Sequence, residues 1–237
     1  MVYVTGDLHG DLSRFRSREF RKLKRKDTLI VCGDFGFLWE GTEREKKLLH
    51  WIGKRKYTVL FVEGVHDNLS LVEAYPEAEW NGGKVREISG KLRHLGRGGV
   101  FTIERRRIFV FGGGEDSESE GSDVQAKWWD KMLPSSEEIA VAQDNLKSVG
   151  DKVDYIITHQ CSRRLKKFLT MRENEANVLD TFFDHLQQTC TFKAWFFGSY
   201  HIDKAIPPNA MAVFQRVVPL PENDFDMSTV NARRGRR

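Results

Sequence analysis

The sequence predicts an α/β fold that contains both parallel and antiparallel strands. In the N-terminal third, apolar runs at residues 2–4, 29–32 and 59–62 alternate with helical patterns. This order favours parallel strands that are joined by right-handed crossovers. In the middle of the chain, the closely spaced apolar runs at residues 100–103 and 108–111 are typical of an antiparallel hairpin. The two observations together predict an α/β fold with mixed strand pairing.

The N-terminal elements follow from the spacing of apolar residues. Residues 11–25 predict a basic helix, because apolar residues recur on one face at helical spacing. The apolar residues of this face are Leu12, Phe15, Phe20 and Leu23. The elements that follow are a strand over residues 28–33, a helix near residues 43–54, a strand over residues 59–62 and a short strand over residues 85–88.

The C-terminal half begins with a clear helix signal. Ser135 and Glu138 match the S-x-x-E capping box, which predicts the N-terminus of a helix. The apolar stripe of this helix comprises Ile139, Ala142, Leu146 and Val149. The remaining elements are a strand over residues 155–157, a helix around residues 175–188, a strand over residues 194–197 and a final strand near residues 210–218.

The bulk composition predicts one domain. The chain has 237 residues, of which 40% are apolar, so we expect one core over residues 1–220 and a flexible, polar, basic tail over residues 221–237. No run approaches 18 uncharged apolar residues, so we expect no membrane span. The three cysteines lack the spacing of metal ligands and fit ordinary thiols in a reducing compartment. Because the chain also starts directly in a strand, we expect a cytoplasmic protein.

Positive charge is concentrated in two segments, although the net charge is only +4. Residues 14–26 contain eight lysines and arginines, and residues 233–237 are basic except for one glycine. Such runs bind phosphate backbones, which makes nucleic acid a candidate partner of the basic helix. The alternative is a solvated helix face and a frayed tail, which is the commoner role of charge runs.

Acidic and imidazole side chains follow the ends of the predicted strands. These residues are Asp7 and His9 after the first strand, Asp34 after the second, His66 after the third, His159 after the strand at 155–157 and His201 after the strand at 194–197. In open α/β sheets the carboxyl ends of strands meet at a shared crevice. One histidine at a strand end is usually a packing or surface residue, but the whole set favours a common site. Carboxylate and imidazole ligands suit divalent Mn, Fe or Zn.

The order of these motifs resembles that of the calcineurin-like metallophosphoesterase family. The chain carries Asp-x-His, then Gly-Asp, then Gly-x-His-Asp, then a lone His and finally Gly-x-x-His. The resemblance extends from residue 3 to about residue 206, and the sequence around residues 33–41, 79–83 and 200–203 is similar to a bacterial branch. It implies a four-layer sandwich of two mixed β-sheets flanked by helices. It also implies a two-metal hydrolase, such as a phosphatase, that cleaves phosphate mono- or diesters with a metal-activated water.

The resemblance assigns a role to each matching residue. The first metal takes Asp7, His9 and His201, and Asp34 bridges to the second metal. His159 matches a ligand of the second metal. His66 matches the catalytic histidine near the scissile phosphate, and Asp67 matches the carboxylate that orients this imidazole.

The chain departs from the family pattern at two positions of the second metal. Val65 stands where the family has Asn, and Ser199 stands where it has His. Valine has no donor atom and a serine hydroxyl is a weak ligand, so only His159 and the shared Asp34 remain. Two protein ligands rarely hold a divalent ion against water. We therefore expect one firmly bound ion rather than two.

Three functions are consistent with this impaired second subsite. In the first, one metal, of which manganese is a candidate, supports hydrolysis of a phosphate-ester substrate while His66 assists the leaving group. In the second, the fold is a catalytically weak or inactive binding or regulatory module. In the third, substrate oxygens complete the second metal site. Intact His66 and Asp67 favour hydrolysis, because a structural relic needs no acid for a leaving group.

Overall fold

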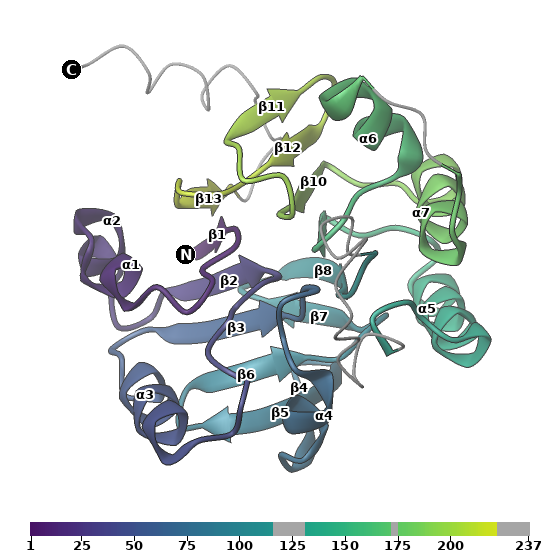
Figure 1. Ribbon diagram of the computed structural model, residues 1–237. Helices are drawn as coiled ribbons and strands as arrows, with labels where there is room; N and C mark the ends of the chain where they lie inside the picture. The colour runs from purple at the N-terminus through teal and green to yellow at the C-terminus, as the bar shows by residue number, and fades with distance from the viewer. Residues whose placement is uncertain (116–130, 172–174, 222–237) are drawn as a thin grey trace, which may run out of the picture.

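Two β-sheets pack face to face in the computed structural model, which describes residues 1–115, 131–171 and 175–221. Helices cover the outer side of each sheet, so the described residues form four layers (Figure 1). This arrangement confirms the predicted α/β sandwich of two mixed sheets flanked by helices. No helix of the described residues combines the length and the apolar character that crossing a membrane requires.

The first sheet has the strand order β13-β1-β2-β3-β6-β5-β4 within the described residues. Its strands are β1 (Val2–Thr5), β2 (Thr28–Cys32), β3 (Thr58–Val62), β4 (Glu77–Trp80), β5 (Gly83–Ser89), β6 (Leu92–Leu95) and β13 (Val218–Leu220). The central strands β1, β2, β3 and β6 are parallel, whereas β13, β5 and β4 pair antiparallel. The predicted parallel pairing of the strands in the N-terminal third is therefore confirmed.

The second sheet has the order β11-β12-β10-β9-β8-β7 within the same residues. Its strands are β7 (Val100–Ile103), β8 (Arg106–Phe111), β9 (Tyr155–Thr158), β10 (Ala194–Phe197), β11 (Lys204–Ile206) and β12 (Ala210–Ala212). Strands β7 and β8 form the predicted antiparallel hairpin. Its turn residues Glu104 and Arg105 both have positive φ, 47° and 65°, as a two-residue hairpin turn requires.

Both faces of each sheet are buried, which explains the continuous apolar runs of the central strands. Along β2, Ile30 lies in the core between the sheets, while Leu29 and Val31 pack against the helices outside. In the second sheet, Ile157 faces the inner core and Ile156 faces the outer helices. Because the two sheets pack against each other through this inner core, loops from both sheets meet at one edge of the sandwich.

The helices confirm most of the predicted pattern. They are α1 (Leu12–Arg16), α2 (Arg18–Lys22), α3 (Glu43–Gly53), α4 (Leu69–Glu73), α5 (Ser136–Ser148), α6 (Arg163–Thr170) and α7 (Val178–Thr189). The capping box of Ser135 and Glu138 starts α5 as predicted. The single helix expected over residues 11–25 is wrong, because Ser17 ends α1 and its hydroxyl accepts a hydrogen bond from Phe20 N at the start of α2.

The expected final strand near residues 210–218 is also wrong. The structure has two strands there, β12 in the second sheet and β13 in the first. Between them the chain passes from one sheet to the other, and the Asp203 carboxylate accepts hydrogen bonds from the backbone N–H groups of residues 214–216. In this segment the Asp203 carboxylate accepts the backbone hydrogen bonds that a neighbouring strand would accept in a continuous sheet. Of the predicted tail at residues 221–237, all but residue 221 lies outside the described residues.

Candidate metal centre

The predicted site residues lie on loops at one edge of the sandwich. They follow five parallel strands: Asp7 and His9 after β1, Asp34 after β2, His66 and Asp67 after β3, His159 after β9 and His201 after β10. Strands β1, β2 and β3 are neighbours in the first sheet, and β9 and β10 are neighbours in the second. Because parallel strands end at the same edge, residues almost 200 positions apart come into contact.

The first candidate ligand group consists of His9, Asp34 and His201. Its ligand atoms lie within 4.8 Å of one another. The Nε2 atoms of His9 and His201 are 2.8 Å apart, and His9 Nε2 lies 3.7 Å from Asp34 Oδ2. Two imidazole nitrogens at this distance need a proton between them, or a cation that both can bind. The group therefore fits two histidine ligands and one carboxylate ligand of a divalent ion.

The second candidate group consists of Asp7, Asp34 and His159, all of which are buried. His159 Nε2 lies 3.6 Å from Asp34 Oδ1, and His159 Nδ1 lies 3.7 Å from Asp7 Oδ1. The Nδ1–H of His159 donates to the carbonyl oxygen of Cys32 at 3.2 Å, so Nε2 is the ring nitrogen that faces Asp34. Among the described residues, neither His159 Nε2 nor Asp7 Oδ2 has a hydrogen-bond partner. Buried atoms of this kind suit a cation.

Asp7 therefore lies with the second group as well as beside the first. The sequence comparison with the family assigned it to the first metal, and this assignment stays a prediction. With Asp7 included, the second group offers three candidate ligands, one more than the sequence pattern left to it. Asp34 belongs to both groups, as expected for a bridging carboxylate.

The backbone is adapted to hold these side chains close together. Positive φ values occur at four predicted ligands: Asp7 (33°), His9 (46°), Asp34 (46°) and His201 (48°). Such values are uncommon outside glycine and cluster at functional sites. A side chain at Gly33 would overlap the His159 imidazole, and one at Gly64 would overlap the Asp34 carboxylate. Glycine at these two positions lets the loops approach the ligands.

The electrostatics of the site suit a divalent cation. Burial raises the pKa of Asp7 to about 6, although His159 and the Ser199 N–H oppose this shift. Burial acts the same way on Asp34, but His159 and His66 outweigh it and hold the pKa of Asp34 well below its usual range. Burial lowers the pKa of His9, so its imidazole is neutral and offers a lone pair near pH 7. The buried Asp34 carboxylate therefore lies beside a His9 imidazole that brings no positive charge, an arrangement that suits a cation.

His66 lies at the exposed side of this cluster. Its ring is 5.3 Å from the ring of His9, and its Nδ1 lies 2.9 Å from Asp34 Oδ2. The Asp67 carboxylate is fully buried and accepts hydrogen bonds from the backbone N–H groups of residues 35, 36 and 64. Asp67 thus ties the loop after β3 to the loop after β2. Its role as the carboxylate that orients the His66 imidazole stays a prediction.

The two substituted positions lie within the same loops. Val65 is buried between Gly64 and His66 and brings no ligand atom. Ser199 has a positive φ of 68°, and its backbone N–H donates to Asp7 Oδ1 at 3.0 Å. The backbone of Ser199 therefore supports Asp7 while its side chain is shorter than an imidazole.

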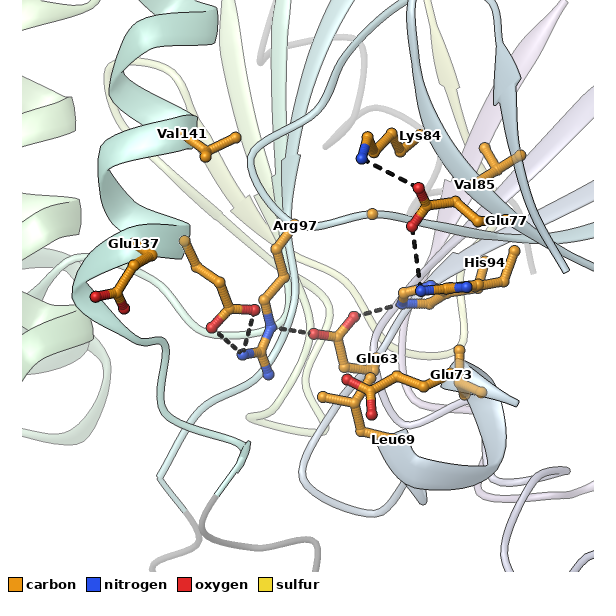
Figure 2. Close-up of a pocket in the computed structure, with 14 residues that line it drawn as sticks. Glu63, Leu69, Glu73, Glu77, Lys84, Val85, His94, Arg97, Glu137 and Val141 are labelled. Atoms are coloured by element: carbon orange, nitrogen blue, oxygen red, sulfur yellow. Dashed lines mark hydrogen bonds and ion pairs between the residues drawn. The ribbon is translucent and has the colours of Figure 1, made fainter. Parts of the chain in front are cut away.

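A buried ion network next to the site was not predicted from the sequence. Glu63 follows β3, is fully buried and bonds to His94 Nε2 at 2.6 Å and to Arg97 Nε at 2.5 Å. Arg97 also donates to Glu138 at the start of α5 and to the carbonyl oxygens of residues 131 and 132. Figure 2 shows Glu63 between His94 and Arg97 on the wall of a cavity of about 330 Å³.

This network holds the base of the loop that carries His66. Glu63 directly precedes Gly64, and its carbonyl oxygen accepts a hydrogen bond from Gly113 N. Arg97 and His94 hold the pKa of Glu63 down at about 2, against the opposing effect of burial. One signal was present in the sequence: a carboxylate at the end of an apolar strand, which is rarely buried without a partner.

Comparison with known protein families agrees with the fold and the site. The family model described as calcineurin-like phosphoesterase matches residues 1–202. A comparison with curated proteins found no similar sequence. The matched segment contains all seven predicted site residues, and the family's metal-dependent phosphoesterase function fits the two ligand groups. The chain therefore belongs to the calcineurin-like phosphoesterase family.

Proposed function

We propose that this protein hydrolyses phosphate mono- or diesters with one firmly bound divalent metal and an impaired second metal subsite. The observation that carries the proposal is the position of Asp34. Its two carboxylate oxygens lie 2.9 Å from His66, 3.7 Å from His9 and 3.6 Å from His159. A single carboxylate that faces three imidazoles on three separate loops is well suited to hold a cation beside a catalytic histidine.

Hydrolysis needs a metal site and a proton donor, and we assign these two roles to different residues of the chain. A divalent metal bound in this site would polarise a phosphoryl oxygen of the substrate and would make a bound water more acidic. His66 has a side chain that is 38% exposed, so it can reach a substrate at the mouth of the site. Asp34 fixes the Nδ1 side of this ring, and we assign to His66 Nε2 the delivery of a proton to the leaving oxygen.

Substitution of His66 by Ala tests this role. We expect His66→Ala to lower kcat for p-nitrophenyl phosphate and bis(p-nitrophenyl) phosphate, assayed with added Mn, by about 100-fold or more, as for loss of a general acid. The metal content should not change, because His66 is outside both ligand groups. His185→Ala, which alters an exposed histidine of α7, is the matched control. Equal activity of His66→Ala and the wild type would contradict the assignment.

The impairment of the second subsite rests on Val65 and Ser199. Asp7, Asp34 and His159 remain near this subsite, but Asp34 is shared with the first group. With Asp7 assigned to the first metal, as the family resemblance implies, His159 and the shared Asp34 are left to hold the second ion, which is too few ligands to bind it firmly. Manganese is a suitable first ion, since it accepts mixed carboxylate and imidazole ligands.

The double variant Val65→Asn with Ser199→His tests the impairment. Both side chains bring ligand atoms to the loops that carry His66 and His201, and histidine tolerates the positive φ of position 199 better than most residues. We expect the bound metal to rise from about one to about two per chain and kcat to rise by about tenfold or more. The control pair is Val65→Ile with Ser199→Gly, which brings no ligand atom and places at position 199 a residue that accepts the positive φ. Unchanged metal content and rate would show that these positions do not limit the second subsite.

A binding module is the second candidate function, supported by the same two substitutions and by the basic segment of residues 14–26. Seven of its basic side chains are exposed: Arg16, Arg18, Arg21, Lys22, Lys24, Arg25 and Lys26. Exposed cations on α1, α2 and the following turn are the composition that phosphate backbones attract.

Binding of a short oligonucleotide tests this candidate. We expect affinity to fall by about tenfold or more as salt rises from roughly 50 to roughly 200 mM, and to fall further in Arg21→Glu with Lys24→Glu. The control is Lys152→Glu, which reverses an exposed charge just before β9 in the second sheet. Binding that ignores both salt and the charge reversal would exclude the basic segment as a nucleic-acid surface.

We place the protein in the cytoplasm. Cys32, Cys161 and Cys190 are buried free thiols, and burial raises the pKa of each. Thiols that are neutral and buried fit a reducing compartment.

A further inference from the structure

The chain passes from the second sheet to the first through residues 213–216, which lie between β12 and β13 (Figure 1). We call these residues the crossing segment. The N–H group of Val213 donates to the carbonyl oxygen of Phe197, at the end of β10, at 2.9 Å. The carbonyl oxygen of Phe214 accepts a hydrogen bond of 3.0 Å from Thr5 Oγ1, at the end of β1. The crossing segment is therefore bonded to one strand of each sheet.

Both of these strands lead directly into candidate metal ligands. Thr5 and Gly6 precede Asp7 at the end of β1, and β10 leads into the loop that carries His201. A side chain at Gly6 would overlap the carbonyl oxygen of Val213. Because Gly6 has no side chain, the crossing segment packs directly against the end of β1. The segment therefore links two ligand loops that belong to different sheets.

The crossing segment also contacts His201 itself. The Phe214 ring lies 5.1 Å from the His201 ring, with an angle of 36° between their planes. The Asp203 carboxylate, on the same loop as His201, accepts hydrogen bonds from the N–H groups of residues 214–216 at 2.9–3.3 Å. Neighbours that fix the orientation of a histidine ring strengthen its binding to a metal. Phe214 is such a neighbour of His201.

Arg14 joins the crossing segment to the end of β1. Its Nη2 donates to the carbonyl oxygen of Phe214 at 2.8 Å, to Thr5 Oγ1 at 2.8 Å and to the carbonyl oxygen of Gln215 at 3.4 Å. The side chain is half-buried, and its guanidinium lies 5.8 Å from the centre of the Phe20 ring. Hydrogen bonds from a charged donor are stronger than those between neutral groups. The contacts of Arg14 therefore lie within the protein, where they hold the crossing segment in place.

We propose that Arg14 is a positioning residue of the metal centre, which holds the crossing segment so that Phe214 fixes the His201 imidazole for the first metal. This inference rests on the metal binding that the proposed function requires, and it adds a residue that lies outside both ligand groups. Arg14 acts through Phe214, and we assign it no contact with the ion or the substrate. Loss of Arg14 should therefore weaken metal binding although every ligand remains.

The affinity of the full chain for Mn, measured by calorimetric titration, tests the proposal. We expect Arg14→Met to raise the Kd for Mn by about tenfold, the lower end of the loss that follows when a group that orients a ligand is removed. Arg14→Lys keeps the charge and a donor, so it should recover part of the affinity. Arg16→Met, which alters an exposed arginine of the same helix, is the matched control and should bind Mn as the wild type does.

The variant Phe214→Leu separates positioning from general support of the fold. It removes the ring beside His201 but keeps the carbonyl oxygen to which Arg14 donates. We expect it to raise the Kd for Mn by a similar factor, and the double variant Arg14→Met with Phe214→Leu to raise it little further, because coupled residues are not additive. If Arg14→Met does not fold by circular dichroism, the same comparison is made with Arg14→Lys.

Two results of these titrations would overturn the proposal. One is a folded Arg14→Met protein that is less stable in urea but binds Mn with the Kd of the wild type, since this would show a purely structural role. The other is a double variant in which the effects of Arg14→Met and Phe214→Leu multiply, since the two residues would then act independently.

A measurement without metal keeps the inference testable if the chain binds no Mn, a result that would refute the metal centre instead. In proton–carbon NMR spectra of the metal-free chain, the signal of the His201 ring depends on the adjacent Phe214 ring, and His201→Gln identifies this signal. We expect Arg14→Met to shift it in the same direction as Phe214→Leu, whereas Arg16→Met leaves it in place. An unshifted His201 signal in Arg14→Met would overturn the assignment of Arg14. Neither measurement depends on hydrolysis, so failure of the proposed activity is a separate result.

Discussion

Asp34→Asn is expected to abolish metal binding and to lower hydrolysis of phosphate esters by roughly three powers of ten or more. Asp34 is the one residue that belongs to both ligand groups, and its charge is buried among three imidazoles. Asparagine keeps the shape of the side chain but removes the negative charge that a divalent ion needs. Elemental analysis and steady-state rates with added Mn measure the two effects.

The control for this substitution is Asp144→Asn, which removes a carboxylate whose side chain is 79% exposed on α5. It should leave metal content and rate unchanged. Circular dichroism should show that Asp34→Asn is folded, because asparagine can still accept a hydrogen bond from His66 N. A folded Asp34→Asn protein that retains its metal would contradict the assignment of the ligand groups.

Arg97→Met is expected to destabilise the fold by about 3–5 kcal/mol, the usual result of breaking a buried ion pair. The Arg97 side chain is 6% exposed and its partner Glu63 is fully buried. Methionine fills much of the space but leaves the Glu63 charge with His94 as its remaining side-chain partner in the network. Urea unfolding of the two proteins measures the difference in the free energy of unfolding.

The pH dependence of this difference has a definite sign. The pKa of Glu63 is about 2 in the folded protein and 4.5 without the fold, so its ionised form stabilises the native state above about pH 4.5. This contribution is lost as the pH falls from about 4.5 toward 2. The difference in the free energy of unfolding between the wild type and Arg97→Met should therefore become smaller as the pH falls from about 4.5 toward 2.

Two further variants show whether the unpaired Glu63 charge causes the loss of stability in Arg97→Met. Glu63→Gln with Arg97→Met removes both charges and should recover part of the stability. Arg86→Met, which breaks the more exposed pair with Glu77 at 3.1 Å on the same cavity, should cost about 1 kcal/mol or less. A loss for Arg97→Met no larger than that for Arg86→Met would show that the network is not a main support of the fold.

The candidate site was largely predictable because each of its residues lies just after the carboxyl end of a strand. Asp7, Asp34 and His159 each follow an apolar run, and the physics of parallel strands brings such positions to one edge. The order of strands and helices likewise gave the α/β class. These features depend on local pattern, which the sequence carries directly.

Features that depend on tertiary contacts were not predictable. The Glu63 network requires β3 and β6 to be neighbours, although 29 residues separate Val62 from Leu92 in the chain. The grouping of Asp7 with His159 requires the two sheets to be placed against each other. The division of the expected helix at Ser17 depends on whether its hydroxyl caps the next helix or faces solvent.

The number of tightly bound metal ions per chain tests the central claim most directly. The protein is loaded with Mn, dialysed extensively and examined by elemental analysis against its measured concentration. We predict about one ion per chain, held by Asp7, His9, His201 and the shared Asp34, because Val65 and Ser199 leave only His159 and Asp34 for a second ion. Two stably bound ions, or none, would contradict the claim.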